Sequence, residues 1–170
     1  MDTMSTPDHQ YALLGKWNLY YHLPQDKNWD VASYKIIMDN ISRADQLVSL
    51  VEQLPANVMR FCMLFVMRQG ITPMWEDPKN RNGGCFSYKV INKQVVEVWK
   101  TLMYALCGES LCVNPKWNHL VNGITISPKK NFCIVKIWLA SCKFQNAAII
   151  NELMGITSHG CLFKKHTPEY

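Results

Sequence analysis

The 170-residue sequence lacks long hydrophobic runs. Its longest apolar stretch, 61–67, falls far short of the roughly 18 or more residues that cross a bilayer, so no membrane-spanning helix is expected. The opening Met1-Asp2-Thr3-Met4-Ser5 has neither the basic flank nor the apolar run of a secretory signal. These absences predict a protein of the cytoplasm, although the nucleus would also fit, with no membrane contact.

The cysteines lack the pattern of a disulfide framework or a zinc site. There are seven, an odd number, and no two form a C-x-x-C pair. The shortest spacing is that of Cys107 and Cys112. Scattered cysteines of this kind are typical of reduced thiols that serve as small apolar side chains. We therefore expect no disulfide and no bound metal.

Recognisable catalytic motifs are also absent. The sequence contains no G-x-S-x-G, no P-loop and no H-E-x-x-H. The five histidines do not pair with a nucleophile at a telling spacing. We expect no catalytic residues, no cofactor and no enzyme, and turnover of nucleotides remains a hypothesis without residues behind it.

The composition fits one ordinary globular domain, with 48% hydrophobic and 18% charged residues. Residues 1–10 are polar and are expected to form a flexible tail. Residues 11–170 are expected to form a single domain, and the protein is expected to be a monomer. The net charge of +5 favours an anionic partner such as a nucleic acid, although the signal is weak alone.

Strand-like and helix-like stretches alternate along the domain. Strands are predicted where aromatic and β-branched residues gather, at 16–23, 34–38, 58–67, 86–90, 120–127, 132–139 and 161–165. Helices are predicted where apolar residues recur at helical spacing, at 42–54, 95–106 and 147–154. Ser42 and Asp45 are expected to form a capping box, and Pro55 to end that first helix. The fold class is therefore α+β, a single curved antiparallel sheet with about three helices on its convex face.

Trp29 and Trp75 stand in polar, turn-rich segments, where an exposed indole is unfavourable. One such tryptophan is best explained as a loop anchor that folds back on the core. Two of them, with Glu76 beside one, favour a binding site instead. A flat base can stack on each indole, with roughly 1–3 kcal/mol per stack. A positive charge on the base adds cation–π attraction, and a carboxylate can accept hydrogen bonds from the edge of guanine.

The stretch 70–77, with Met74-Trp75-Glu76-Asp77 at its end, and Asn80-Arg81-Asn82-Gly83-Gly84 resemble the central signature of the translation initiation factor 4E family. These are the eukaryotic proteins that bind the mRNA cap. Further matches occur in family order at Lys16-Trp17, Lys27-Asn28-Trp29, Asn92-Lys93-Gln94, Trp99, Gly108-Glu109-Ser110 and Ile137-Trp138. The resemblance covers roughly residues 11 to 167, and the chain is similar to a divergent, short member.

The resemblance implies a binding cleft on the concave side of the sheet. Trp29 and Trp75 would hold the 7-methylguanine between them, and Glu76 would bind its Watson–Crick edge. Trp138 would contact the N7-methyl group. Trp17 and Trp99 match structural positions and are expected in the core.

Departures from the family pattern concern the cap phosphates. Cys85-Phe86 replace the arginine and tryptophan that usually follow the double glycine. A second family arginine falls near Ser127, and a family lysine aligns with Ile134. We expect nearby lysines to bind phosphate instead, or else to be ordinary surface charges; they are Lys129, Lys130 and Lys136. Because lysine is a point charge and cannot bind a phosphate through two N–H groups at once as arginine does, the phosphates would be bound more loosely.

At the end of the chain, Lys164, Lys165 and His166 would contact the second nucleotide or its phosphate in place of the family's longer C-terminal loop.

Other departures concern the surface that receives partner proteins in the family. Val48 stands where a tryptophan is usual, and Lys100 and Thr101 replace a leucine and a glutamate. A scaffold or inhibitor protein with the usual helical motif would therefore bind weakly or differently.

Two functions follow from these residues. The first is binding of capped mRNA in translation initiation or its control. The alternative is a protein–protein interaction module that keeps the fold while its cap binding is weak or lost.

Overall fold

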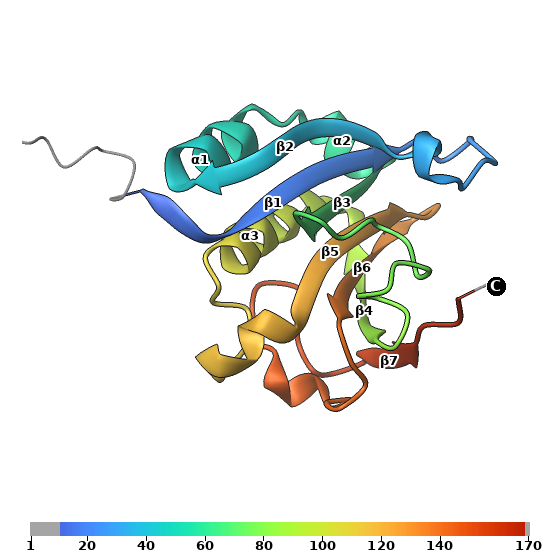
Figure 1. The fold of residues 1–170 in the computed structure, drawn as a ribbon. Coiled ribbons are helices and arrows are strands. Elements are labelled where there is room, and N and C mark those ends of the chain that lie inside the picture. The colour runs from blue at the N-terminus through green and yellow to red at the C-terminus, as the bar shows by residue number, and fades with distance from the viewer. Residues whose placement is uncertain (1–10, 169–170) are drawn as a thin grey trace, which may run out of the picture.

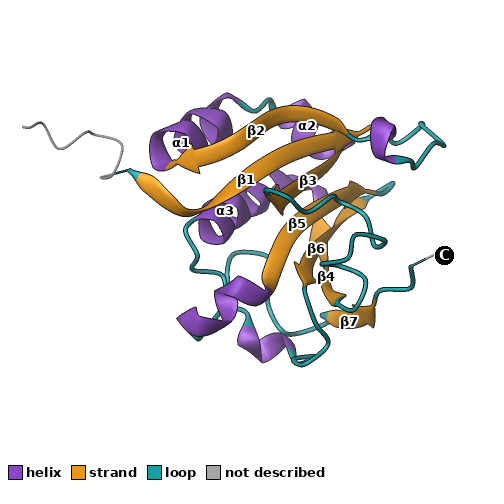
Figure 2. Cartoon of the chain, viewed as in Figure 1, coloured by secondary structure: helices purple, strands orange, loops and turns teal. Residues whose placement is uncertain are grey.

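The computed structural model describes residues 11–168, so the tail expected at 1–10 lies outside the described residues. Within this part, seven strands form one antiparallel sheet in the order β2-β1-β3-β5-β6-β4-β7 (Figure 1). The strands are β1 Ala12–His22, β2 Lys35–Arg43, β3 Met63–Arg68, β4 Gly84–Ile91, β5 Val121–Pro128, β6 Phe132–Leu139 and β7 Leu162–Lys165. The α-helices are α1 Ala44–Gln53, α2 Ala56–Phe61 and α3 Val95–Cys107. Figure 2 shows these helices together on one side of the sheet.

The central strands are buried on both faces, and alternate side chains enter two different clusters. In β3, Leu64 and Val66 belong to the main core, which includes the helices. Phe65 and Met67 belong to a smaller cluster with Trp138. This division follows from the two-residue period of a strand. The face of the sheet away from the helices is therefore lined by its own apolar side chains and is available for a pocket.

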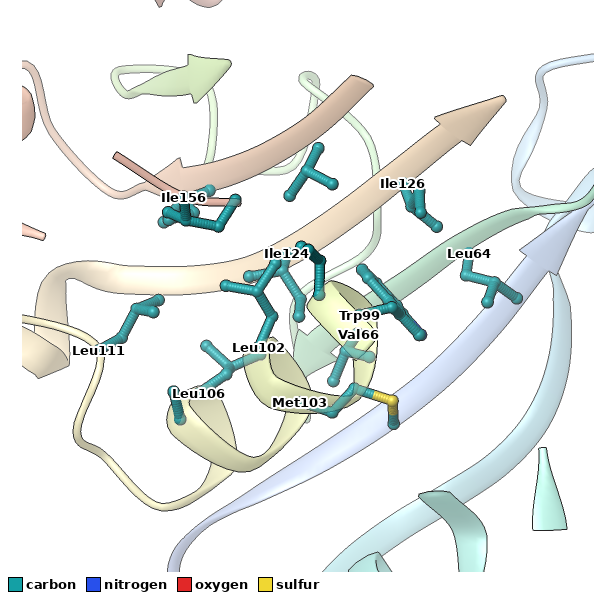
Figure 3. Packing of buried hydrophobic residues seen from close by; sticks show 14 of the residues in the cluster. Leu64, Val66, Trp99, Leu102, Met103, Leu106, Leu111, Ile124, Ile126 and Ile156 are labelled. Carbon is teal, nitrogen blue, oxygen red and sulfur yellow. The ribbon is translucent and has the colours of Figure 1, made fainter. Parts of the chain in front are cut away.

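The long helix α3 forms because apolar residues recur at helical spacing over its whole length. Trp99, Leu102 and Met103 are fully buried. Figure 3 shows them beside the strands that carry Leu64 and Ile124. Trp17 is also fully buried, so the expected core role of both Trp17 and Trp99 is confirmed.

The predicted helix after β2 is confirmed, but the predicted cap is wrong. α1 begins at Ala44, and Gln46 Oε1 accepts hydrogen bonds from the backbone N–H groups of Ser42 and Arg43, both at 3.1 Å. Asp45 instead binds the guanidinium of Arg43 at 2.9 Å. The side chain of Gln46 is long enough to reach back over the first turn, so it takes the place expected of Asp45.

The strand predicted at 58–67 is only half correct. Residues 56–61 form the short helix α2, and β3 starts at Met63. Pro55 starts the helix, because its carbonyl accepts hydrogen bonds from Val58 and Met59 at 3.0 and 3.3 Å. A continuous apolar run fits a buried strand and a buried helix equally well, which explains the error.

The third helix predicted at 147–154 is wrong. Only Ala147–Ile149 form a short 3-10 turn. The backbone that follows pairs with the loop after α3, since Asn151 N donates to Leu111 O at 2.9 Å. The Asn151 side chain also donates to Ser110 O and Cys112 O. These hydrogen bonds replace the ladder that a helix would have made.

The α+β class and the antiparallel sheet with helices on one face are confirmed. All the predicted strands exist in some form; the strand predicted at 132–139 has the expected ends, and the others have shifted ends. Three α-helices are described, as expected in number. One of them, α2, was not predicted, and the helix predicted at 147–154 does not form.

A partly buried ion pair ties the end of β3 to the loop after α3. Arg68 binds Glu109 with both terminal nitrogens, at 2.7 and 2.9 Å. Its remaining N–H groups donate to the carbonyls of Val121 and Asn118 at 2.8 and 2.9 Å. The guanidinium also lies 4.4 Å from the ring centroid of Trp17. This two-pronged contact with several further partners is specific to arginine.

We expect Arg68→Lys to lower the free energy of unfolding by about 2–4 kcal/mol, because lysine cannot replace the two-pronged contact or satisfy both carbonyls. Urea unfolding followed by circular dichroism measures the loss. Arg60→Lys, at an exposed position of α2, is the matched control and should leave the midpoint nearly unchanged. An equal response of the two variants would show that the Arg68 contacts contribute little.

Candidate functional site

A pocket of about 540 Å³ lies on the sheet face that carries Phe65 and Trp138, away from the helices. Its walls come from strands β3, β5 and β6 and from the β1–β2 and β3–β4 loops. The lining side chains are Trp29, Tyr34, Met63, Phe65, Pro73, Met74, Trp75, Glu76, Thr125, Ser127, Lys136 and Trp138. The structure thus brings together all the residues predicted to contact the base, along with one of the predicted phosphate-binding lysines.

The floor of the pocket is set by the pairing of β5 with β6. Lys136 stands opposite Thr125, and Trp138 follows two residues later on the same face. Trp138 is 5% exposed, and its indole N–H donates to Thr125 Oγ1 at 3.3 Å. The orientation of this indole is therefore fixed by the sheet before any ligand enters.

The β1–β2 loop is held by its own polar side chains. Asp26 Oδ1 accepts from Asn28 N at 2.9 Å, and Asn28 Oδ1 accepts from Asp30 N at 3.1 Å. Asp30 Oδ1 accepts in turn from Ser33 N at 3.2 Å. Such turns let Asp and Asn satisfy the backbone without a sheet or helix. A polar segment can therefore hold Trp29 in one place while its side chain stays 46% exposed.

The aromatic neighbours of Trp29 connect it to the sheet. His22, the last residue of β1, stacks on the indole with ring centroids 3.8 Å apart and an angle of 3° between the planes. Tyr34 meets Trp29 edge-on at 6.1 Å and meets Phe65 at 5.2 Å. One face of Trp29 is thus covered by a buried ring.

The β3–β4 loop, which carries Trp75, is also fixed by side-chain hydrogen bonds. Asp77 Oδ2 accepts from the backbone N–H of Thr72 at 2.7 Å and from its hydroxyl at 2.9 Å. Asn80, fully buried, donates to the carbonyls of Thr72 and Met74 at 3.0 and 2.9 Å. These contacts hold the loop in a tight series of turns on both sides of Trp75.

Behind Trp75 lies a buried histidine–cysteine pair. His166 is 4% exposed and stacks on Trp75 with centroids 5.7 Å apart and 17° between the planes. Its Nδ1 lies 2.7 Å from Asn80 O and its Nε2 lies 2.9 Å from Cys85 Sγ. Both ring nitrogens are therefore engaged inside the protein, and the structure does not support the predicted phosphate contact of His166.

This pair is not an activated nucleophile. Burial lowers the pKa of His166, and burial raises the pKa of the Cys85 thiol to about 12. Both groups are therefore neutral at pH 7, whereas a nucleophilic cysteine needs its thiolate. A neutral imidazole that donates from Nδ1 and accepts the S–H proton at Nε2 satisfies both contacts.

Glu76 is exposed at the edge of the pocket. Burial raises the pKa of Tyr34 to about 12, and the negative charge of Glu76 adds to this effect. The carboxylate therefore acts electrostatically on Tyr34 of the opposite loop, and both side chains line the same pocket.

Two of the predicted lysines lie beside tryptophans of the pocket. Lys136 is half-buried in the pocket wall. Lys164, on β7, places its ammonium group 5.9 Å from the ring centroid of Trp75. A cation at this distance from an indole is favourable, and it provides positive charge next to the pocket.

The other lysines predicted to bind phosphate are farther from the pocket lining. Lys129 and Lys130 occupy the exposed turn between β5 and β6, next to the strand end that carries Ser127. Lys165 is exposed and pairs with Gly84 in the sheet.

The residues expected on the altered partner surface lie on the helices. Val48 is 48% exposed on α1, while Lys100 and Thr101 are half-buried on α3. A separate groove of about 560 Å³ runs between α1 and β2 and is lined in part by Ile37 and Leu50. The helix side and the pocket side of the sheet are thus physically distinct.

Sequence reasoning missed His22 and Tyr34 as parts of the site. His22 ends a strand and carries no motif, so no sequence signal pointed to it. Tyr34 opens a predicted strand, and only the fold shows that its ring meets Trp29.

Residues 11–168 contain neither a candidate metal site nor a candidate membrane-spanning helix. No cluster of three or more His, Cys, Asp or Glu side chains suited to a metal ion occurs there. None of the helices described is long and apolar enough to span a membrane.

Comparison with solved structures identifies the same fold in cap-binding proteins. C. elegans eIF4E-3, in complex with the 4E-binding protein Mextli and a cap analog, matches with a TM-score of 0.67 and 22% identity over 77% of this chain and 75% of that one. A schistosome eIF4E complexed with m7GpppG and 4E-BP matches with a TM-score of 0.68 and 22% identity, covering 77% and 72%. At this identity the likeness establishes the fold alone.

The chain is also similar in sequence to initiation factors 4E of several organisms. An Acanthamoeba polyphaga mimivirus protein, "Eukaryotic translation initiation factor 4E homolog", is 38% identical over 88 residues, which are 52% of this chain and 29% of that protein. Schizosaccharomyces pombe factor 4E-2 is 28% identical over 94% of this chain and 66% of its own length. The human factor is 27% identical over 85% and 68%. The chain thus spans less than two thirds of the length of the first two of these relatives.

The family described as "Eukaryotic initiation factor 4E" matches residues 12–167, which is nearly all of the described structure. This range includes every strand of the sheet, both loops that carry the pocket tryptophans, and the pocket glutamate. The chain is therefore a divergent member of the eukaryotic initiation factor 4E family of cap-binding proteins.

Proposed function

We propose that this protein binds the 7-methylguanosine cap of mRNA and acts in the cytoplasm in translation initiation or its control. The observation that carries the proposal is that Trp29, Trp75 and Glu76 line one pocket although they come from two separate loops. The family is non-enzymatic, and a neutral Cys85 thiol gives no reason to assign catalysis.

Recognition of the base rests on charge as well as on shape. Methylation at N7 makes guanine cationic, and tryptophan is the best aromatic side chain for a cation. In this proposal the base lies between Trp29 and Trp75, and Glu76 accepts hydrogen bonds from its N–H and NH₂ groups while balancing its charge. Trp138, fixed on the floor, contacts the methyl group. An unmethylated guanine would lose the charge-dependent part of this binding energy.

The phosphates would leave the pocket over the sheet. Lys136 is the first positive charge on that route, because it lines the pocket next to Trp138. The described strands β4, β5, β6 and β7 contain no Asp or Glu, so nothing on these strands repels an anion. Lys164 supplies a second charge beside Trp75, and Lys129 and Lys130 border the outer end. Lys165 remains a candidate for the following nucleotide.

A second candidate is a protein-interaction module with the same fold. It is favoured by the groove between α1 and β2 and by the exposed Val48 on the same helix. Solved structures of two relatives contain a 4E-binding protein. Because Val48, Lys100 and Thr101 change this side of the molecule, we propose that a scaffold or inhibitor of the usual kind binds weakly. Absence of cap binding in the experiment below would favour this candidate.

Titration with 7-methyl-GTP should quench the intrinsic tryptophan fluorescence strongly, whereas GTP should have little effect, because only the methylated base is cationic. Glu76→Gln keeps the size of the side chain but removes its charge, so it should weaken 7-methyl-GTP binding by about tenfold or more. Glu152→Gln, at another exposed glutamate, is the matched control. Equal, feeble responses to both nucleotides would contradict cap binding.

Lys136→Gln should weaken binding of 7-methyl-GTP by about fivefold or more, since a charge-assisted contact to phosphate is lost. The same substitution should leave binding of 7-methylguanosine, which has no phosphate groups, nearly unchanged. Fluorescence titration of both ligands separates the two effects, and Lys93→Gln, at an exposed lysine outside the pocket, is the control. A similar loss for both ligands would mean that Lys136 supports the base and not the phosphates.

A further inference from the structure

The pocket tryptophan Trp29 has a partner that no motif identifies. His22 is fully buried, although it directly precedes an exposed polar loop. Its ring lies parallel to the indole of Trp29, with 3.8 Å between centroids and 3° between planes. At this separation the two parallel rings are in van der Waals contact face to face.

The imidazole of His22 is itself held in place from both sides of the ring. Its Nδ1 lies 2.9 Å from Leu23 O, and its Nε2 lies 2.7 Å from Asn28 O. These carbonyls belong to the start and the end of the segment that leads to Trp29. The loop therefore wraps around the ring, which donates to one of the two carbonyls as a neutral imidazole and to both only as the imidazolium.

His22 and Trp29 together determine which surface a ligand can reach. A flat indole has two faces, and the parallel ring of the buried His22 lies against one of them. Trp29 nevertheless remains 46% exposed and lines the pocket. Only its other face is left for a base. Tyr34, edge-on to both rings, blocks sideways movement toward Phe65.

We propose that His22 is a positioning residue, which holds Trp29 in its ligand-binding orientation in the unliganded protein. The loop is then already ordered when a base arrives, so binding does not have to supply the free energy of ordering it. The part of the inference that concerns ligand affinity rests on the proposed cap binding. The part that concerns the orientation of Trp29 does not.

The structure contains a second tryptophan–histidine stack for comparison. Trp75 also has a buried imidazole behind it, but His166 is offset at 5.7 Å and tilted by 17°. Trp75 is held in addition by the hydrogen bonds of Asp77 and Asn80 in its own loop. The closer, parallel contact occurs at the more exposed of the two tryptophans, where less of the surrounding protein holds the ring.

The test compares His22→Phe with His22→Leu. Both substitutions are apolar and remove the contacts to the two carbonyls, but only phenylalanine restores a flat ring under Trp29. Protein labelled with 5-fluorotryptophan gives a separate fluorine resonance for each indole, and Trp29→Phe identifies the one from Trp29. The exposed His119→Ala is the control for loss of a histidine.

Without any ligand, the Trp29 resonance should stay near its original position in His22→Phe. In His22→Leu it should move toward that of a solvent-exposed tryptophan and show a larger shift between H₂O and D₂O, while the buried Trp17 and Trp99 resonances stay fixed. Those two resonances report whether the variant is folded. An unchanged Trp29 resonance in folded His22→Leu would overturn the proposal.

With 7-methyl-GTP, His22→Leu should bind about tenfold more weakly, mainly through slower association measured by stopped flow, and His22→Phe should recover most of the affinity. Equal losses in the two variants would overturn the stacking role. If the unsubstituted protein does not bind 7-methyl-GTP, cap binding fails, while the fluorine spectra of the free protein still decide the role of His22.

Discussion

The two-residue alternation of the central strands is the constraint on which the site depends. Alternate residues of β3 and β6 enter opposite sides of the sheet, since Leu64, Val66 and Ile137 belong to the helix core while Phe65, Met67 and Trp138 belong to the opposite cluster. A shift of one residue in β6 would send Lys136 and Trp138 into the core and Ile137 into the pocket. The floor of the pocket is thus fixed by the same register that stabilises the fold.

The two tryptophans that line the walls are held by a different kind of interaction. Short polar side chains hold their loops, because Asp26, Asn28 and Asp77 accept hydrogen bonds from the loop backbone. Buried rings then support the indoles from behind, since His22 lies under Trp29 and His166 under Trp75. The ordered loops and the rigid floor together give a pocket whose shape exists before a ligand binds, which lowers the entropic cost of recognition.

The side chains beside the pocket differ from those that the family resemblance predicts. Cys85 replaces an expected arginine, and its thiol lies against His166 as a neutral, buried group. Positive charge beside the pocket comes from Lys136 on the pocket wall and Lys164 on the edge strand. Each of these side chains suits its exposure, because Cys85 is buried whereas Lys136 is half-buried and Lys164 is exposed.

The sequence alone determined the α+β class, most strands, the helices α1 and α3, and four residues that line the pocket, Trp29, Trp75, Glu76 and Trp138, because periodic patterns and a long family motif are local signals. It did not determine helix α2, the irregular segment 150–156, the capping role of Gln46 or the buried position of His166. Nor did it reveal the stacking of His22 on Trp29. Each of these depends on which backbone groups find partners and which rings meet after distant segments pack, and only the tertiary structure decides that.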